Sequence, residues 1–551
     1  MPPALYFVTA LISLATVPLV ASATVTASAD AVAWRTCLAE ETGMPASSLG
    51  DRLQCATMSA PLDHTHPMLG EVDVGLIRVR AMDLAHREGA LFFNVGGPGG
   101  NPREFVPLVA EWWSALDATD PDTGDLKKVA ERYDLMAVVP RGLKGGHVYD
   151  CALPHDSAPF HNLSADLSDA NWRAAERNAL AMADACTRDP FRPFVDTEQH
   201  VRDMEFARRL FGDAPMNFYG TSYGTWVGAW YGAMYPEKVG RMLFDSTMDF
   251  TSDFAFATFA QVRGGHEVFM AKALRPAIDA PRSYELGVDE GALLQRVRAM
   301  PARARDAWLA QLDSPAALAA ALAMADWIQA APSIDVDGLA IRIAGHTFSR
   351  NADANAAIRV AAKVLAEEYA AGHGITIEAA LGTDGVSVNQ AVLCNDTPWM
   401  KNAFYWRTVV LNAAYHFTGG SGSEAHGALV CSAWPASGTQ RPDMARLGRA
   451  PAFLMIHAEH DRSTSLADAL VVLDSYSRPQ MIIARGMTGH GVLRPAAPSC
   501  MLRAAGTYLL TGQMPGQKLS DCEATPSSTP RSSRAALDDI DRRLGQLFER
   551  S

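Results

Sequence analysis

The sequence predicts an α/β fold with a mostly parallel sheet flanked by helices, interrupted by a large helical insertion. Apolar segments typical of buried strands end in glycine-rich or polar turns, as in "ALFFNVGGPGG" (90–100), "NFYGTSYG" (217–224) and "QMIIARGMTGHGV" (480–492). The residues from Tyr223 to Tyr235, which follow the second of these strands, suit a buried helix that stops at Pro236. Two further strands, one ending at Phe244-Asp245 and one starting near Ala452, are separated by about 200 residues, which predicts the insertion.

Composition limits the class of protein. The chain has 551 residues, 48% hydrophobic and 20% charged, which is enough for a large core. The formal net charge is −13, and no run of Lys and Arg stands out along the sequence. Nucleic-acid binding is therefore not expected, since such proteins usually carry a basic face.

The N-terminal segment differs from the rest of the chain. Residues 4–20 are apolar and are followed by Ala21-Ser22-Ala23, a typical cleavage site, so residues 1–23 are predicted to be a signal peptide and the protein secreted or periplasmic. The first basic residue is Arg35, so the usual basic start is missing, and an uncleaved anchor or a misassigned start codon is the alternative. No second long apolar run follows, so no stable membrane insertion is expected after cleavage.

An even number of cysteines in an exported chain favours disulfides. Eight cysteines allow about 105 pairings, and pairing neighbours in sequence order is the simplest hypothesis. No C-x-x-C occurs and the H-x-x-H of His457 and His460 lacks a third ligand, so no metal site is expected. The cysteines are Cys37, Cys55, Cys151, Cys186, Cys394, Cys431, Cys500 and Cys522.

The pattern Gly220-x-Ser222-x-Gly224 is typical of a serine nucleophile held on a sharp strand-to-helix turn. The five residues alone are weak evidence, since a capping serine in a glycine turn is the alternative reading. Context favours the nucleophile, because Asp461 and His490 each follow a predicted strand and complete the chain order Ser, Asp, His of α/β-hydrolases. Asp245 and Glu459 are the rival acids.

A glycine-rich turn after an early strand commonly supplies a donor for the oxyanion in such enzymes. We expect the main-chain amide of Gly97, in "NVGGPGG" (94–100), and that of Tyr223 to form this oxyanion hole. A phosphate-binding glycine loop is the alternative, but no G-K-[ST] follows.

Together these residues resemble the exported tripeptidyl aminopeptidase branch of the proline iminopeptidase-type serine peptidases, which have the α/β-hydrolase fold. The resemblance covers most of residues 34–522 and rests on "NVGGPGG", "TEQHVRDMEFARRLFG" (197–212), "GTSYGT" (220–225), "LCNDTPW" (393–399) and the late cysteine region (500–522). Two positions depart from the family pattern: Val95 stands where histidine is frequent, and Val139 stands where an aspartate is usual.

The predicted organisation is a core over residues 24–245 and 450–522, a mainly helical cap over 246–449, and a linker with a short amphipathic helix over 523–551. In that helix Leu537, Ile540, Leu544 and Leu547 recur at helical spacing, for docking on the core or for pairing with another copy.

We expect an exported serine hydrolase that needs no cofactor and acts on peptides with a free N-terminus. The alternatives are a carboxylesterase that acts on small esters with the same residues and, more remotely, a binding protein on a hydrolase scaffold. An aminopeptidase needs a carboxylate for the substrate's α-amino group. The sequence does not choose among the cap candidates Glu367, Glu368, Asp384, Asp396 and Glu424.

Overall fold

The computed structural model describes residues 32–44, 48–151, 158–212, 214–372, 377–420, 424–436, 438–523 and 534–550. The expected signal peptide at 1–23 and the segment 524–533 of the expected linker lie outside the described residues.

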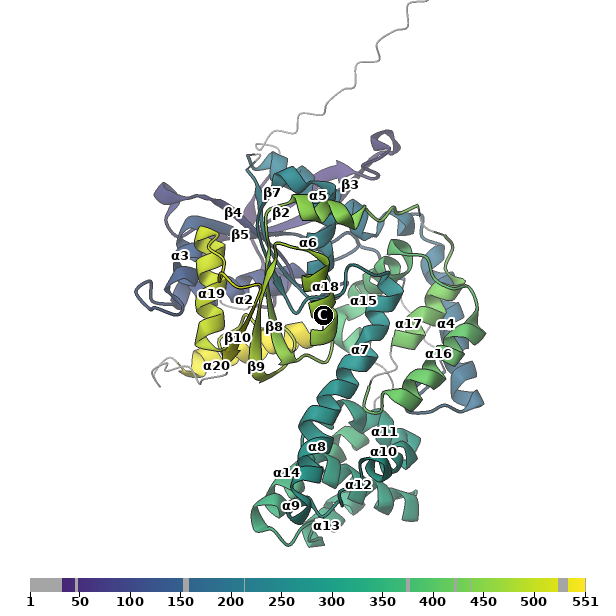
Figure 1. The fold of residues 1–551 in the computed structure, drawn as a ribbon. Helices are drawn as coiled ribbons and strands as arrows, with labels where there is room; N and C mark the ends of the chain where they lie inside the picture. The colour runs from purple at the N-terminus through teal and green to yellow at the C-terminus, as the bar shows by residue number, and fades with distance from the viewer. Residues whose placement is uncertain are drawn as a thin grey trace, which may run out of the picture.

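The described strands form one sheet in the order β1-β2-β3-β5-β4-β6-β7-β8-β9-β10 (Figure 1). Every pair from β5 to β10 is parallel, whereas β1, β2 and β3 join antiparallel at one edge. The prediction of a mostly parallel sheet is confirmed. The strands are β1 Arg35–Thr36, β2 Leu53–Pro61, β3 Glu71–Val79, β4 Gly89–Asn94, β5 Tyr133–Val138, β6 Met216–Thr221, β7 Val239–Asp245, β8 Leu454–His460, β9 Gln480–Thr488 and β10 Leu519–Glu523.

Helices cover both faces of the sheet, so the central strands are apolar throughout rather than alternating. All six residues of β5 are buried. Successive side chains enter different cores: Phe92 and Phe218 pack with α5, α6 and α18, while Phe93 and Tyr219 pack with α2, α3, α19 and α20. These helices are α2 Pro102–Ala115, α3 Gly124–Arg132, α5 Thr197–Leu210, α6 Tyr223–Met234, α18 Leu466–Ser475, α19 Ser499–Thr511 and α20 Arg534–Arg550.

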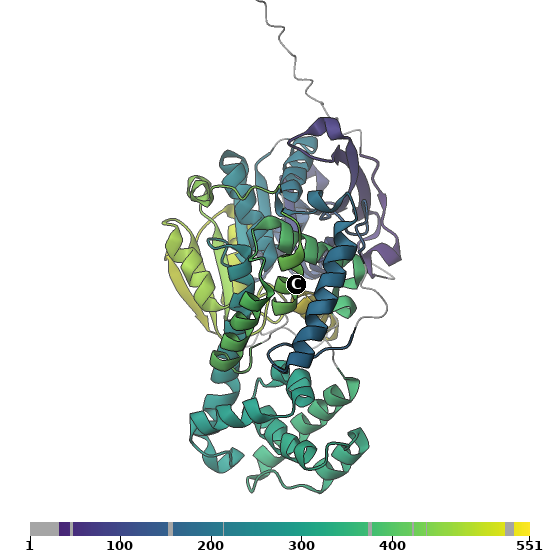
Figure 2. The same cartoon turned by 90° about the vertical axis from the view of Figure 1, so that its right-hand side faces the viewer.

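Strands β7 and β8 are parallel neighbours, with Leu243 opposite Leu454, although residues 246–453 separate them along the chain. The described part of that insertion is helical. Helices α8 to α14 form a lobe that projects away from the sheet and has its own hydrophobic cluster (Figures 1 and 2). The helices are α7 Phe254–Phe269, α8 Arg275–Asp279, α9 Pro281–Tyr284, α10 Glu290–Ala299, α11 Ala302–Trp308, α12 Pro315–Ala330, α13 Val336–Gly345, α14 Ala352–Ala371, α15 Ile377–Asp396, α16 Ala403–His416 and α17 Glu424–Ala433; α1 Ala39–Thr42 and α4 Asp169–Thr187 precede the insertion.

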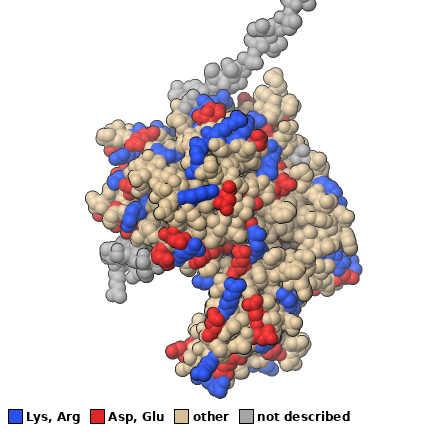
Figure 3. All heavy atoms as spheres, in the orientation of Figure 1, with Lys and Arg blue, Asp and Glu red and all other residues tan. Residues whose placement is uncertain are grey.

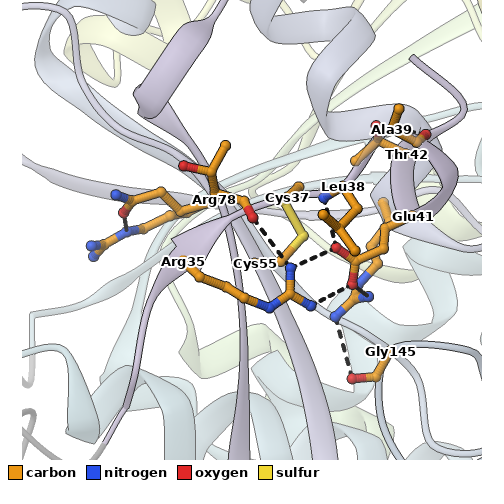
Figure 4. Close-up of a disulfide and its surroundings, with 12 residues drawn as sticks. Arg35, Cys37, Leu38, Ala39, Glu41, Thr42, Cys55, Arg78 and Gly145 are labelled. Carbon is orange, nitrogen blue, oxygen red and sulfur yellow. Dashed lines mark hydrogen bonds and ion pairs between the residues drawn. A yellow bond between two sulfur atoms is a disulfide. The ribbon is translucent and has the colours of Figure 1, made fainter. Parts of the chain in front are cut away.

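Four disulfides join the cysteines in sequence order, as the simplest hypothesis predicted: Cys37–Cys55, Cys151–Cys186, Cys394–Cys431 and Cys500–Cys522. Beside the first of them, Glu41 accepts hydrogen bonds from Arg35 at 2.7 Å and from Arg103 at 2.9 Å (Figure 4). The bond to Arg35 holds the pKa of Glu41 at about 2, against the opposing effect of burial. The ion pairs and the disulfide together fasten the described N-terminal residues to α2 and β2.

Candidate active site

Ser222 lies between the end of β6 and the start of α6, with φ 58° and ψ −125°. A positive φ is costly for a residue with a Cβ and persists only where the surroundings enforce it. Here the amide of Ser222 donates to the main-chain oxygen of Asp245 at 3.0 Å, and its carbonyl accepts from the amide of Thr225 at 2.8 Å. The chain is therefore held in the sharp turn that the sequence pattern predicts.

The two glycines of the pattern allow the turn to close. A Cβ on Gly220 would lie 2.4 Å from the carbonyl oxygen of Gly224, and a Cβ on Gly224 would lie 2.3 Å from that of Asn94. Neither contact is possible for a real side chain, because backbone atoms at that distance cannot move aside. The glycines are needed for packing of strand, turn and helix as well as for backbone conformation.

The carboxylate of Asp461 contacts Nδ1 of His490 at 2.9 and 3.0 Å. Two further bonds at 2.9 Å, from the amides of Ser463 and Thr464, fix the carboxylate in its loop after β8. Burial would raise the pKa of Asp461, but the facing His490 lowers it to about 2, so the group is an anion near neutral pH. A proton on Nδ1 leaves Nε2 as the basic nitrogen of the neutral imidazole ring.

The loop that carries His490 is bound to Asp245, the residue that also binds the amide of Ser222. The carboxylate of Asp245 accepts from the amides of Val492 and Leu493 at 2.8 and 2.9 Å, while its main-chain oxygen accepts from Ser222. The hydroxyl of the next residue, Ser246, accepts from the amide of Gly491 at 2.9 Å. The end of β7 thus links the serine turn to the histidine loop.

Each of the two rival acids binds other groups. Burial raises the pKa of Asp245, which also accepts from the hydroxyl of Tyr219 at 2.8 Å. Glu459 accepts from the amide of Gly486 at 2.7 Å and pairs with Arg485 at 3.0 Å. The geometry therefore favours Asp461 as the partner of His490.

The glycine turn after β4 lies against the serine turn. A Cβ on Gly96 would come within 3.0 Å of the Ser222 Cβ and 3.2 Å of the Tyr223 amide nitrogen. The amide of Gly96 is engaged, donating to Oδ1 of Asn94 at 3.0 Å. Tyr223 begins α6, where amides have no acceptor inside the helix. The predicted pair of donors, Gly97 and Tyr223, thus lies in two segments that touch.

Two residues that the sequence did not suggest hold this turn. The side-chain oxygen of Asn94 accepts a hydrogen bond from the amide of Gly96, and its Nδ2 lies 3.2 Å from Nε2 of the buried His200. From the cap, Asn389 on α15 donates to the main-chain oxygen of Pro98 at 3.0 Å. An asparagine carries no local signal of such a contact in a single sequence, so only the fold could identify these two residues.

The departure at Val139 lies in a loop that other contacts hold firmly. Val139 is buried, and its amide donates to the carbonyl oxygen of Gly75 at 2.8 Å. Arg141 follows and binds the buried carboxylate of Asp203 at 2.7 and 2.8 Å. Burial would raise the pKa of Asp203, but Arg141 lowers it to about 2. The ion pair anchors this loop without the usual aspartate.

The five acidic cap candidates lie in different surroundings. Glu367 is exposed on α14, with Glu368 half-buried beside it. Asp384 accepts from the amide of Lys144 at 2.9 Å, and Asp396 accepts from the amide of Thr197 at 2.9 Å. Glu424 is buried and lines a hollow of about 200 Å³ that is also bordered by Arg462 and Ser463, the residues directly after Asp461. Glu424 therefore borders a cavity beside the acid loop.

Within the described residues, no group of three or more His, Cys, Asp or Glu side chains is arranged to hold a metal ion. No helix in that part of the chain is long and apolar enough to cross a membrane.

Comparison with known proteins supports the α/β-hydrolase fold. Residues 168–268 match the family model described as "alpha/beta hydrolase fold", and residues 420–522 match the model described as "TAP-like protein". The tripeptidyl aminopeptidase of Streptomyces coelicolor is 27% identical over 515 residues, which cover 90% of this chain and 86% of that protein. Carboxylesterase B of Mycobacterium tuberculosis is 26% identical over 491 residues, with 85% and 86% covered.

A parallel sheet with a serine at its strand-to-helix turn, together with these matches, defines the chain as an α/β-hydrolase of the serine hydrolase class. Within that class it resembles the tripeptidyl aminopeptidase branch of the proline iminopeptidase-type serine peptidases.

Proposed function

We propose that the chain is an exported aminopeptidase that releases tripeptides or single residues from free N-termini through an acyl-enzyme on Ser222. The observation that carries the proposal is the buried contact of Asp461 with Nδ1 of His490, in a loop fixed to the same strand end as Ser222. The relatives named tripeptidyl aminopeptidase support the peptide substrate, and four disulfides support export.

In the proposed mechanism Nε2 of His490 takes the proton of the Ser222 hydroxyl as Oγ attacks the scissile carbonyl carbon. Asp461 holds the ring in the required tautomer and stabilises the imidazolium that forms. The oxyanion accepts hydrogen bonds from the amides of Gly97 and Tyr223. His490 then gives its proton to the departing amine, and a water molecule hydrolyses the acyl-enzyme with His490 again as the base.

The amino group of the substrate is assigned to Glu424. An ammonium group needs a carboxylate in a partly enclosed site, and Glu424 borders the hollow of about 200 Å³ beside the acid loop. Glu367 is exposed, which does not suit a partly enclosed site. A carboxylate in this hollow would favour free over blocked N-termini.

A carboxylesterase is the second candidate, because carboxylesterase B of Mycobacterium tuberculosis matches over 85% of this chain. The same three residues would act, but on an uncharged ester and without a role for Glu424. A binding protein without activity is the third candidate, and it predicts that Ser222 does not react with a serine-directed phosphonate.

The test uses three substrates on the purified protein: a free-amine tripeptide anilide, its acetylated twin and a short p-nitrophenyl ester. Cleavage of the free peptide only, lost in Ser222→Ala, is the expected result. Ester cleavage without peptide cleavage would replace the aminopeptidase by the esterase. Equal rates for wild type and Ser222→Ala on all three would remove the catalytic proposal.

The role of Glu424 is tested separately. Glu424→Gln should raise KM for the free-amine peptide about tenfold or more, since a charged partner is lost, while ester hydrolysis stays unchanged. Glu367→Gln, an exposed cap carboxylate, is the matched control. If Glu424→Gln slows ester and peptide equally, Glu424 has a structural role instead.

A further inference from the structure

Four arginines converge on a surface hollow far from the site described above. The hollow has a volume of about 510 Å³ and is lined by Arg78, Arg80, Arg87 and Arg209, with Asp134 as the one carboxylate among its lining residues. Figure 3 shows Lys and Arg side chains gathering over the end of the molecule where β3 and α5 lie in Figure 1. The chain as a whole carries a formal charge of −13, so this concentration of positive charge opposes the overall balance.

The fold holds these cations in place. Arg78 lies at the end of β3, where its Nε donates to Gln54 at 2.9 Å and its guanidinium stacks 4.0 Å from the ring centre of Trp34. Arg80 is two residues further, so it projects to the same side as Arg78. Side chains fixed in this way lose little freedom when a ligand binds, which favours recognition.

The positive charge in the hollow is only partly balanced. Asp134 binds Nε of Arg87 at 2.9 Å and the amide of Ala81 at 2.8 Å. Within the described residues, no ion pair involves Arg78, Arg80 or Arg209. Burial lowers the pKa of Arg78, and the nearby charges of Arg80 and Arg87 lower it further, against Asp134. Several positive charges therefore lie close together, and a bound anion would reduce the repulsion between them.

The hollow is separate from the candidate active site. Asp134 and Met136 lie on β5, whose first residue, Tyr133, pairs with Gly89 at the start of the parallel strand β4. The glycine turn and Ser222 follow the opposite ends of β4 and β6. Substrates at Ser222 and a ligand in the hollow would thus occupy opposite ends of the sheet.

We propose that this hollow binds a ligand that bears phosphate groups. The planar guanidinium group can donate two parallel hydrogen bonds to two oxygens of a phosphate. A multiply charged anion also balances the charge of several arginines better than a single carboxylate does. The side chains of Met136 and Phe211 also line the hollow and suit the carbon part of a phosphate ester. The same chemistry is offered by a soluble phosphate ester and by the head group of an anionic phospholipid.

The experiment measures two probes on the full chain: inorganic pyrophosphate by titration calorimetry, and vesicles of phosphatidylglycerol against phosphatidylcholine by co-sedimentation. The test variant is Arg80→Glu with Arg209→Glu, and the control is Arg173→Glu with Arg177→Glu. The control pair lies exposed on α4 and changes the net charge equally. Thermal unfolding and activity at Ser222 check that each variant folds, and Arg80→Gln with Arg209→Gln replaces a variant that does not.

Saturable pyrophosphate binding that weakens at least tenfold in the test variant alone supports a soluble phosphate ligand. Binding to phosphatidylglycerol vesicles alone, lost in the test variant and kept in the control, supports a phospholipid head group. Absence of saturable binding to both probes, or equal weakening in test and control variants, overturns the proposal, since long-range attraction would then explain any association.

Discussion

The side-chain amide of Asn389 donates to the main-chain oxygen of Pro98 at 3.0 Å. This bond joins cap helix α15 to the glycine turn that is expected to stabilise the oxyanion. One turn earlier on α15, the backbone of Gly385 packs directly on Gly99, where an added Cβ would lie 2.2 Å from the Gly385 oxygen. Helix α15 therefore contacts the glycine turn directly and holds it in position.

Removing the Asn389 bond should slow the chemical step. Asn389→Ala is expected to lower kcat by about 10- to 100-fold with a smaller change in KM, because small displacements of an oxyanion donor are costly. Steady-state kinetics on ester and peptide substrates measure the split. Asn412→Ala, an exposed amide on α16, serves as the control. A change in KM alone would assign Asn389 to substrate binding.

Asp461 should matter far more than its neighbour Glu459. Asp461→Asn keeps the shape of the side chain but presents the wrong group to Nδ1 of His490, so kcat should fall by about 10⁴-fold. Glu459→Gln, two residues earlier, loses its negative charge and its ion pair with Arg485 and should change kcat little. Similar losses in both variants would mean that the loop after β8 has been disturbed as a whole.

The buried carboxyl group of Asp396 should make the free energy of unfolding decline as pH rises. Burial, with Asp196 nearby, raises its pKa from the ordinary 3.8 to about 8, so the folded state holds the proton more tightly than the unfolded state. Stability from this group is full below about pH 4 and falls as pH rises through about 8. Asp396→Asn mimics the protonated form and should unfold at a higher temperature than wild type at pH 9.

At pH 4, Asp396→Asn and wild type should unfold at nearly the same temperature, because Asp396 is then protonated in both the folded and the unfolded state to a large extent. A difference at pH 9 that is absent at pH 4 therefore reports titration of Asp396 and not a change in packing. Thr197 offers Asp396 its amide and hydroxyl, and an asparagine can keep both contacts. If Asp396→Asn unfolds at a lower temperature than wild type across the whole range, the ionised carboxylate is the stable form in the folded protein.

The C-terminal helix α20 should support the histidine loop. Phe548 is buried, and its ring packs against Gly491, where an added Cβ would lie 2.2 Å from a ring atom. Asp541 accepts from the amide of Ala496 at 2.8 Å in the same loop. Phe548→Ala should lower the free energy of unfolding by about 3 kcal/mol and reduce kcat, because the loop beside His490 loses its support.

Gln546→Ala is the control on the exposed side of α20. Denaturant unfolding and kinetics with the same substrates measure both effects. Full activity in Phe548→Ala, with the expected loss of stability, would limit α20 to a structural role.

The sequence alone could identify the mostly parallel sheet and the positions of Ser222, Asp461 and His490, because each of these residues directly follows a strand-like segment. Local patterns of this kind record what the backbone does within a few residues. The predicted catalytic roles remain a prediction. The pairing of the cysteines in sequence order is also confirmed. Each disulfide joins two cysteines that lie in one short stretch of the chain.

Contacts between distant segments could not be found in this way. Asn389 and Pro98 lie 291 positions apart, and an asparagine on a helix is most often solvated. The arginines of the hollow come from two distant stretches of chain, residues 78–87 and Arg209 on α5, and only folding brings them together. Among five acidic candidates the sequence offered no choice, and only the folded chain shows that Glu424 lines a hollow beside Arg462 and Ser463.

The sequence by itself determined the fold class and the candidates for the chemical step, because strand, turn and helix preferences are set by neighbouring residues. Tertiary structure decided which acid faces His490, how the cap holds the glycine turn and where positive charge gathers. These depend on distances across the folded chain, and hydrogen bonds and charge interactions act only once folding has brought the groups within a few ångströms.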